Sequence, residues 1–145
     1  MNTTLETAER ALRLLAPGYE TGNFGPYLEM LTDDFTFWTP TGAFRGKNVG
    51  KEAAARNYRF IAEAPNTKIH LSTPYSVTSG DSTVIFELED GGTLLRHPFQ
   101  NRVVFAMDVR GDQICGFREY VGDVDLELFS QISGQPQEKT PQGTP

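Results

Sequence analysis

A carboxylate on an apolar strand face is the first candidate for chemistry in this chain. The segment GFREYVGD, residues 116–123, alternates so that Glu119 shares a face with Phe117 and Val121. Loss of water around such a carboxylate raises its pKa toward neutrality, which suits a general acid or base. A salt bridge between Glu119 and Arg102 on the neighbouring strand is the structural alternative.

A second polar group, Asn101, lies on the matching face of the strand that precedes Glu119. Alternation places Asn101 with Phe99 and Phe105. An amide beside a carboxylate can orient it or hold a water molecule, whereas a purely structural amide would satisfy an irregularity of the strand. We predict that Asn101 assists Glu119 and that Phe99, Phe105 and Phe117 line a binding pocket.

Asp90 is the third candidate for catalysis. It precedes two glycines, and the triplet DGG, residues 90–92, predicts a turn or bulge. One interpretation makes Asp90 a turn residue, and the other makes it a second carboxylate in the pocket. The preceding acids, Glu87 and Glu89, alternate with apolar residues and are expected on the solvent or dimer side of their strand.

Aromatic side chains complete the predicted pocket. We predict that Trp38, the only tryptophan, lines it, although a shift of one residue would turn the opposite face of that strand inward. The competing inward set consists of Phe35, Phe37 and Thr39. Tyr19 and Tyr58 could each offer a phenol to a bound ligand, while the alternative for both is an ordinary place in the core.

The composition gives little support to metal or nucleic-acid chemistry. His70 and His97 are expected on the surface, and the single cysteine, Cys115, is expected to be a small buried hydrophobe. These residues are too few for most histidine or cysteine metal sites. The 145 residues carry a net charge of −6 without a basic stripe, which argues against nucleic acid as a partner. We expect no metal and no organic cofactor.

The elements that must position these residues come in the order helix, helix, strand, helix and then strand after strand. Helices are predicted over 4–16, 23–31 and 48–64, the first ended by Pro17-Gly18 and the third capped by Asn48. Strands are predicted over 33–40, 67–78, 82–89, 93–96, 98–109 and 113–122, with turns or bulges at SGD, DGG and RGD. This order predicts an α+β fold in which a curved antiparallel sheet and three N-terminal helices form a cone around an apolar pocket.

The chain length predicts one domain, residues 1–130, followed by a polar tail over residues 131–145. No apolar run approaches the roughly 20 residues that span a bilayer, so no membrane partner is expected. The N-terminus is acidic and polar, unlike a signal peptide, and a cytoplasmic location is expected.

The segments YLEMLTDDFTFWTPTGAFRGKNVGKEA and GGTLLRHPFQNRVVFAMDVRGDQICGFREYVGD carry a family resemblance. With them, residues 5–126 resemble the SnoaL-like branch of the nuclear transport factor 2-like superfamily. That branch includes polyketide cyclases, steroid isomerases, limonene-epoxide hydrolases and phenazine-pathway proteins. The most specific part is the final hairpin, with Pro98, Phe99, Asn101 and Arg102, a Gly-Asp turn, and REY before an acid. The resemblance implies the cone fold.

The resemblance also implies a catalytic role for Glu119. The epoxide hydrolases place a catalytic acid before Tyr on the last strand, and the phenazine-pathway proteins place a Glu acid or base there. The Arg and Asp that the hydrolases need on the middle strand match Leu88 and Asp90, so the Arg is missing. The base and the helix-1 Tyr of the steroid isomerases match Thr39 and Leu15.

We therefore expect a small enzyme that isomerises or cyclises an apolar, oxygen-bearing molecule such as a polyketide or terpenoid. Epoxide opening is one alternative, and a non-catalytic ligand-binding or dimerisation module is another. Dimers are common in this family and an exposed sheet face needs cover, so we expect a homodimer through the outer face of the sheet.

Overall fold

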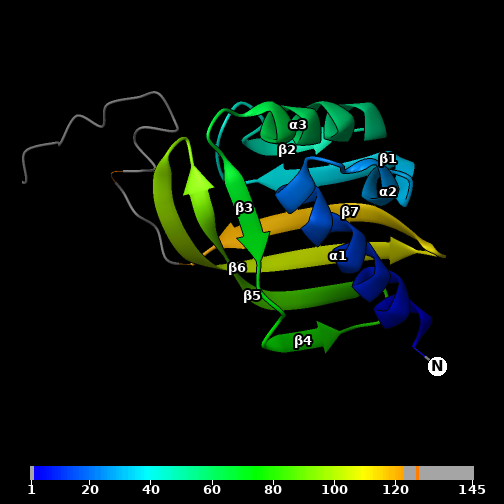
Figure 1. The fold of residues 1–145 in the computed structure, drawn as a ribbon. Coiled ribbons are helices and arrows are strands. Elements are labelled where there is room, and N and C mark those ends of the chain that lie inside the picture. The colour runs from blue at the N-terminus through cyan, green and yellow to red at the C-terminus, as the bar shows by residue number, and fades with distance from the viewer. Residues whose placement is uncertain (1, 123–126, 128–145) are drawn as a thin grey trace, which may run out of the picture.

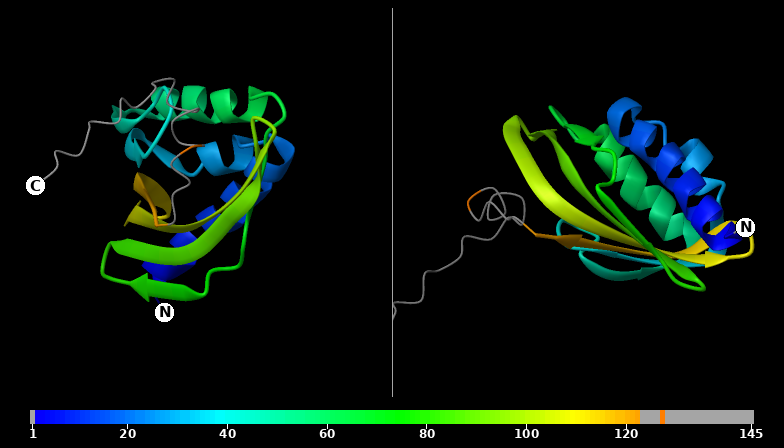
Figure 2. Two further views of the ribbon diagram at one scale, coloured as in Figure 1. Left: turned by 90° about the vertical axis from the view of Figure 1, so that its left-hand side faces the viewer. Right: turned by 90° about the horizontal axis from the view of Figure 1, so that it is seen from below.

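A computed structural model describes residues 2–122 and residue 127 of the chain. Helices α1 (Thr3–Thr21), α2 (Gly25–Leu28) and α3 (Lys51–Glu63) all lie on the concave side of one strongly curved sheet (Figures 1 and 2). The predicted α+β cone is thereby confirmed. The predicted domain end at residue 130 and the predicted tail, residues 131–145, lie outside the described residues. Within the described part, no helix is both long and apolar enough to cross a bilayer.

Helix α1 continues past Pro17, so the prediction that Pro17-Gly18 ends it was wrong. Gly18 is buried against the ring of Phe24, which a Cβ at this position would overlap. The helix ends at Gly22, whose left-handed backbone (φ +82°) lets its N–H donate to the Gly18 carbonyl. Packing of this last turn outweighs the single hydrogen bond that proline removes. Tyr19 is therefore held on a helix.

Helix α3 begins at Lys51, three residues later than predicted. Asn48 does not cap it, because Asn48 lies in strand β2 (Gly46–Val49) and its amide donates to the Phe44 carbonyl at 2.7 Å. Strand β2 pairs with β1 (Leu31–Thr39), and it was missed because GKNV is short, polar and without a clear alternation.

The described strands form a seven-stranded sheet in the order β2-β1-β7-β6-β5-β3, with β4 paired to β5. The remaining strands are β3 (Lys68–Leu71), β4 (Ser76–Ser79), β5 (Thr83–Leu94), β6 (His97–Arg110) and β7 (Gln113–Val121). Neighbours run antiparallel, except that β1 and β7 are parallel, so the sheet is mixed. The predicted strand over 67–78 is divided into β3 and β4. The predicted turns at SGD and RGD are confirmed.

The DGG triplet does not reverse the chain, because β5 runs through it as one continuous strand. Gly92 has φ +122°, and a Cβ there would overlap the carbonyl oxygen of Lys68 in β3. Strand β4 pairs with the first half of β5 and β3 with the second half, along the same edge. The two glycines therefore let β5 bend and accept β3 closely, which helps to close one side of the cone.

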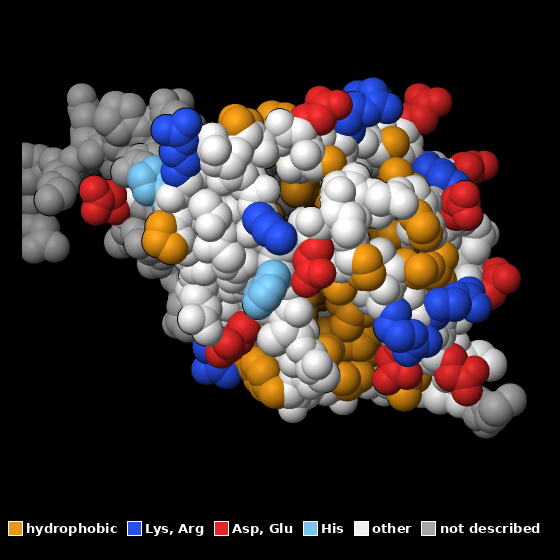
Figure 3. Space-filling model, in the orientation of Figure 1, with side chains coloured by type: hydrophobic (Ala, Val, Ile, Leu, Met, Phe, Trp, Pro, Cys, Tyr) orange, Lys and Arg blue, Asp and Glu red, His pale blue; other side chains and the backbone are white. Residues whose placement is uncertain are grey.

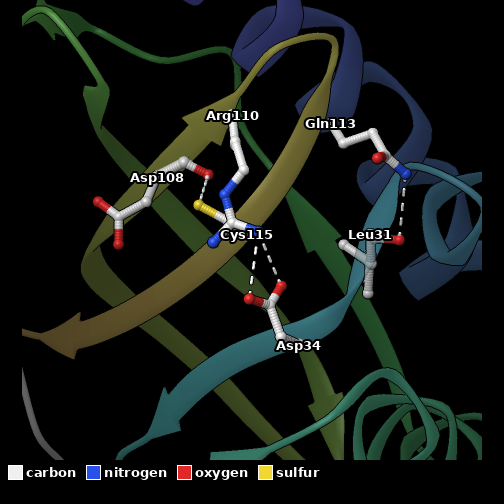
Figure 4. Close-up of polar contacts among 6 residues, drawn as sticks. All are labelled: Leu31, Asp34, Asp108, Arg110, Gln113 and Cys115. Carbon is white, nitrogen blue, oxygen red and sulfur yellow. Dashed lines mark hydrogen bonds and ion pairs between the residues drawn. The ribbon is translucent and has the colours of Figure 1, made fainter.

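Polar contacts near the RGD turn join strands β1, β6 and β7 (Figure 4). Arg110 forms an ion pair with Asp34 at 3.0 Å, and the Gln113 amide donates to the Leu31 carbonyl at 3.5 Å. The Cys115 thiol is half-buried and lies 3.6 Å from the Asp108 carbonyl, to which it donates. Burial raises the pKa of this thiol, which favours its protonated form at neutral pH.

The core fills one end of the cone and leaves the other end hollow. At the filled end, the inward side chains of β5, β6 and β7 are buried, among them Phe86, Phe105, Met107 and Phe117. They belong to the same apolar cluster as Ala8, Ala11 and Leu15 of α1. Further along the same strand faces, the inward positions carry Asp90, Asn101 and Glu119, and this is where the cavity opens.

Candidate functional site

A cavity of about 180 Å³ lies between the helices and the open end of the sheet. Figure 3 shows hydrophobic side chains gathered in a hollow between α3 and α1. Its aromatic lining comes from helices, strands and the loop after β1, and consists of Tyr19, Phe44, Tyr58, Phe60, Phe99, Phe105 and Phe117. Its polar lining includes Thr39, Thr41, Asn57, Thr67, Asp90, Asn101 and Glu119.

Eight of the nine predicted site residues lie on this cavity wall. The three predicted catalytic residues are there, namely Glu119, Asn101 and Asp90. The predicted binding residues on the wall are Phe99, Phe105, Phe117, Tyr19 and Tyr58. The cone therefore brings together residues from α1, α3, β5, β6 and β7, while their roles in binding and catalysis stay predictions.

Trp38 is the exception, because it lies on the outer face of the sheet with 47% of its surface exposed. The alternative inward set is the correct one, since Phe35 and Phe37 are fully buried and Thr39 lines the cavity. The prediction failed by one residue of register. In an alternating strand such a shift sends the whole set to the other face.

Glu119 projects from β7 into the cavity, opposite Phe105 of β6. Its accessible surface faces the cavity, and its carboxyl makes no hydrogen bond or ion pair with any described residue. Burial, with a smaller contribution from the negative charge of Asp90, raises the pKa of Glu119 to about 8. The salt-bridge alternative was wrong, because Arg102 lies on the outer face and donates to the Tyr75 hydroxyl at 3.0 Å.

Asp90 sits within β5, directly across from Asn101 of β6. Burial raises the pKa of Asp90 to about 6, although a hydrogen bond from the Asn101 side chain acts to lower it. Its Oδ1 atom is buried without a hydrogen-bond partner among the described residues. The turn interpretation was therefore wrong. Asp90 has the same parity as the buried Phe86 and Leu88, a signal that the two glycines obscured.

The Tyr19 hydroxyl is a hydrogen-bond donor at the cavity wall. The ring packs edge-on against Phe24 with centroids 5.3 Å apart and approaches Tyr58 at 6.5 Å. No described residue forms a hydrogen bond with its hydroxyl. Burial, followed by the negative charges of nearby groups with Glu119 first among them, raises the pKa of Tyr19 well above its ordinary value. The phenol therefore keeps its proton at neutral pH.

Asn57 of α3 is a cavity residue that the sequence analysis did not propose. Only 6% of its surface is exposed, and its amide forms no hydrogen bond with another described residue. In the sequence it is a polar residue within the apolar stripe of α3. This interruption of the apolar stripe is the sequence signal that could have identified Asn57. In the structure, a buried amide without a hydrogen-bond partner is unusual and points to a role in the cavity.

The described lining of the cavity is acidic. It contains two carboxyls but no Lys, Arg or His side chain. His70 and His97 are exposed, as predicted. Within residues 2–122 and 127, no group of three or more His, Cys, Asp or Glu side chains is arranged to hold a metal ion.

Comparison with solved structures decides the family. An NTF2-like protein from Anabaena variabilis is 44% identical in sequence, with a TM-score of 0.81, over 86% of this chain and 92% of that one. The chain belongs to the NTF2-like family. This confirms the superfamily that the sequence resemblance indicated. No protein-family model and no curated protein matches the sequence.

More distant structures share the fold of this NTF2-like chain. One is a protein with a ketosteroid isomerase-like fold from Catenulispora acidiphila in complex with trimethylamine, with 20% identity, a TM-score of 0.65 and coverage of 90% and 97% of the two chains. Another, from Jannaschia, is assigned as a SnoaL-like polyketide cyclase, with 17% identity, a TM-score of 0.65 and coverage of 92% and 94%. These similarities show the fold alone.

Proposed function

We propose that this NTF2-like protein is an acid–base isomerase or cyclase for a small oxygenated molecule, with Glu119 as the residue that moves the proton. The observation that carries the proposal is the enclosed Glu119 carboxyl, which faces the cavity without a described partner. With its pKa near 8, the ionised form is a stronger base than an ordinary carboxylate. A structural carboxylate would be expected to have an ion pair or hydrogen bonds instead.

In the proposed reaction, ionised Glu119 takes a proton from a carbon atom beside a carbonyl group. The electron pair of the broken C–H bond forms a C=C bond, and negative charge moves to the carbonyl oxygen. The Tyr19 hydroxyl and the Asn57 amide are the donors available to this oxygen, and such donors stabilise a developing enolate. Isomerisation ends when Glu119 returns the proton to a different carbon. In a cyclisation, the enolate carbon attacks a second carbonyl and the proton goes to the new alkoxide.

Asp90 and Asn101 would act as positioning residues in this scheme. The negative charge of Asp90 raises the pKa of Glu119, which strengthens Glu119 as a base. Asn101, directly across the strand pair, holds the Asp90 carboxylate through its side chain.

Epoxide opening has less support. In that alternative, Glu119 would protonate the epoxide oxygen and Asp90 would activate the nucleophile. The position that matches the arginine of epoxide hydrolases holds Leu88, which is fully buried in the core and supplies no charge. Fold neighbours assigned as isomerases and polyketide cyclases support the general class of reaction, while their low identities leave the substrate open.

The proposal is tested first without any substrate, by carbon-13 NMR titration of the labelled Glu119 carboxyl. We expect a midpoint near pH 8. A midpoint near the ~4.3 of an ordinary glutamate would instead favour a non-catalytic binding module.

The second test follows deuterium exchange beside the carbonyl of a panel of one-ring ketones in heavy water by proton NMR. We expect Glu119→Gln to slow the exchange about 10²- to 10⁴-fold. The wild-type kcat/KM should rise with pH through a midpoint near 8, because the base must be ionised. Glu87→Gln, the same change on the outer face of β5, is the matched control and should leave the rate unchanged. Full activity in Glu119→Gln would refute the assignment.

A further inference from the structure

We propose that the cavity binds a compact organic cation, a protonated amine or quaternary ammonium carried on a single ring or a group of similar size. This names the ligand class of the same site, and it rests on the proposed function only in treating the cavity as a substrate site. Size, charge and unused hydrogen-bonding groups each support it.

The size of the cavity limits the ligand. Its volume is about 180 Å³, and an apolar protein cavity of about 150 Å³ is known to hold one benzene molecule. A single ring with a small substituent therefore fits the described cavity, whereas a fused multi-ring system would need side chains to move. Phe60 at the wall remains largely exposed, which places it at the rim rather than in the interior.

The carboxyl groups on the cavity wall favour a ligand with a positive charge. Glu119 and Asp90 are enclosed with no cationic side chain among the described lining residues, and they lie close enough for the charge of Asp90 to act on Glu119. Coulomb interactions are stronger in such an enclosed site than in water. An entering anion would be repelled by Asp90, which is largely ionised at neutral pH. An entering cation would relieve the repulsion and favour the ionised form of Glu119, the form that accepts a proton.

Unused polar groups point to a ligand independently of these charges. The amide of Asn57 is more than nine-tenths buried, lines the cavity and has no described hydrogen-bond partner. The Tyr19 hydroxyl also lines the cavity without a described hydrogen-bond partner. The oxygens of both groups can accept hydrogen bonds from a ligand that supplies donors. An ammonium group supplies N–H donors, or polarised C–H groups if it is quaternary.

The aromatic wall adds a second attraction for a cation. Phe105 and Phe117 form a tilted pair with centroids 5.1 Å apart, and Tyr19 and Tyr58 face the cavity from the helices. The faces of aromatic rings carry partial negative charge and attract ammonium groups by about 0.5–2 kcal/mol. Carboxylates together with rings thus favour a cation over a neutral molecule of the same shape.

The test uses three probes of closely similar shape and different charge: phenyltrimethylammonium, tert-butylbenzene and benzenesulfonate. Binding to the full chain is measured at neutral pH by proton–nitrogen NMR titration. We expect the cation to bind about tenfold more tightly than the neutral probe and the sulfonate not to bind. The double variant Asp90→Asn, Glu119→Gln should lose the preference for the cation and keep the neutral probe, whereas Glu87→Gln should behave as wild type.

The inference is overturned if the neutral probe binds as tightly as the cation, if the sulfonate binds, or if none of the three binds. It is also overturned if the double variant keeps the preference for the cation. Failure of this inference is distinguishable from failure of the proton-transfer proposal, which is decided by the Glu119 titration and the exchange rate of Glu119→Gln with neutral ketones.

Discussion

At the scale of single residues, the enclosed carboxyl of Glu119 makes the free energy of unfolding depend on pH. Its pKa rises from 4.5 in the unfolded chain to about 8 in the folded protein. Between these values the folded state holds a proton that the unfolded state has lost. The contribution of Glu119 to stability is therefore fully present below pH 4.5 and is lost as the pH rises through 8.

We predict that Glu119→Gln removes this dependence. The variant and the wild type should have similar free energies of unfolding near pH 4.5, and above pH 8 the variant should be more stable by on the order of 3 kcal/mol. Urea denaturation of both proteins between these pH values measures the difference in their free energies of unfolding. Asp90 is present in both proteins, so its own pH dependence largely cancels in this difference. A constant difference across the range would show that Glu119 is solvated in the folded protein.

Most of the site could be predicted from alternation along single strands. Phe117, Glu119 and Val121 share the face that the sequence indicated, because the second half of the last strand alternates regularly. The irregularity in its pairing with β6 lies earlier, between Ile114 and Gly116. Trp38 could not be placed, since both faces of its strand carry large side chains and only the partners in the sheet decide between them.

Asp90 and Asn57 show why other site residues were less certain or missed. Local turn chemistry suggested a reversal at Asp90, whereas pairing with β3 and β6 keeps the strand extended. Asn57 was visible only as a break in a helical pattern. A polar interruption identifies a cavity residue only after the cavity itself is known.

At the scale of elements, the bend of β5 depends on a glycine that no other residue can replace without strain. We predict that Gly92→Ala lowers the free energy of unfolding by about 2–4 kcal/mol, because the new Cβ overlaps the Lys68 carbonyl and φ +122° is unfavourable for alanine. Thermal and urea denaturation measure the loss. The variant should also weaken probe binding, since the bend positions Asp90.

Gly42→Ala is the matched control for the bend. Gly42 also has a left-handed backbone (φ +81°), but no atom lies within 4 Å of a Cβ built there. Its substitution should cost only about 1–2 kcal/mol, the backbone strain alone. Equal losses in the two variants would mean that the approach of β3 to β5 is not tight.

The boundaries of elements followed tertiary contacts more than local propensity. Proline and glycine are normally reliable signals for the end of a helix, yet α1 continues through both because Gly18 packs on Phe24. Strand β2 exists because β1 offers an edge with which it pairs. The order of helices and strands could be predicted from the sequence pattern alone. These boundaries could not, because contacts with neighbouring elements decide them.

At the scale of the whole molecule, the outer face of the sheet carries exposed side chains that the helices do not cover. Trp38, Arg118, Ala106 and Ile85 are successive cross-strand neighbours over β1, β7, β6 and β5. Trp38 and Ile85 expose 47% and 38% of their surface, and Tyr120, two residues from Arg118 along β7, exposes 57%. Ala106 is buried between these neighbours, so the exposed apolar surface of this face comes from Trp38, Ile85 and Tyr120. Large apolar side chains exposed on an uncovered sheet face favour association.

We propose that two copies of this chain pair through this outer face. Light scattering after size-exclusion chromatography should show a dimer for the wild type, and the double change Trp38→Glu, Tyr120→Glu should shift it to monomer, because four carboxylates would then face one another across the interface. Leu95→Glu, at the tip of the β5–β6 hairpin, alters a side chain of comparable exposure (40%) away from this row and should leave the dimer intact. A monomeric wild type would contradict the dimer, and a dimer that withstands the double change would show that the interface lies elsewhere.

Because the cavity opens on the concave side, the dissociated variant should keep the probe affinities of the wild type.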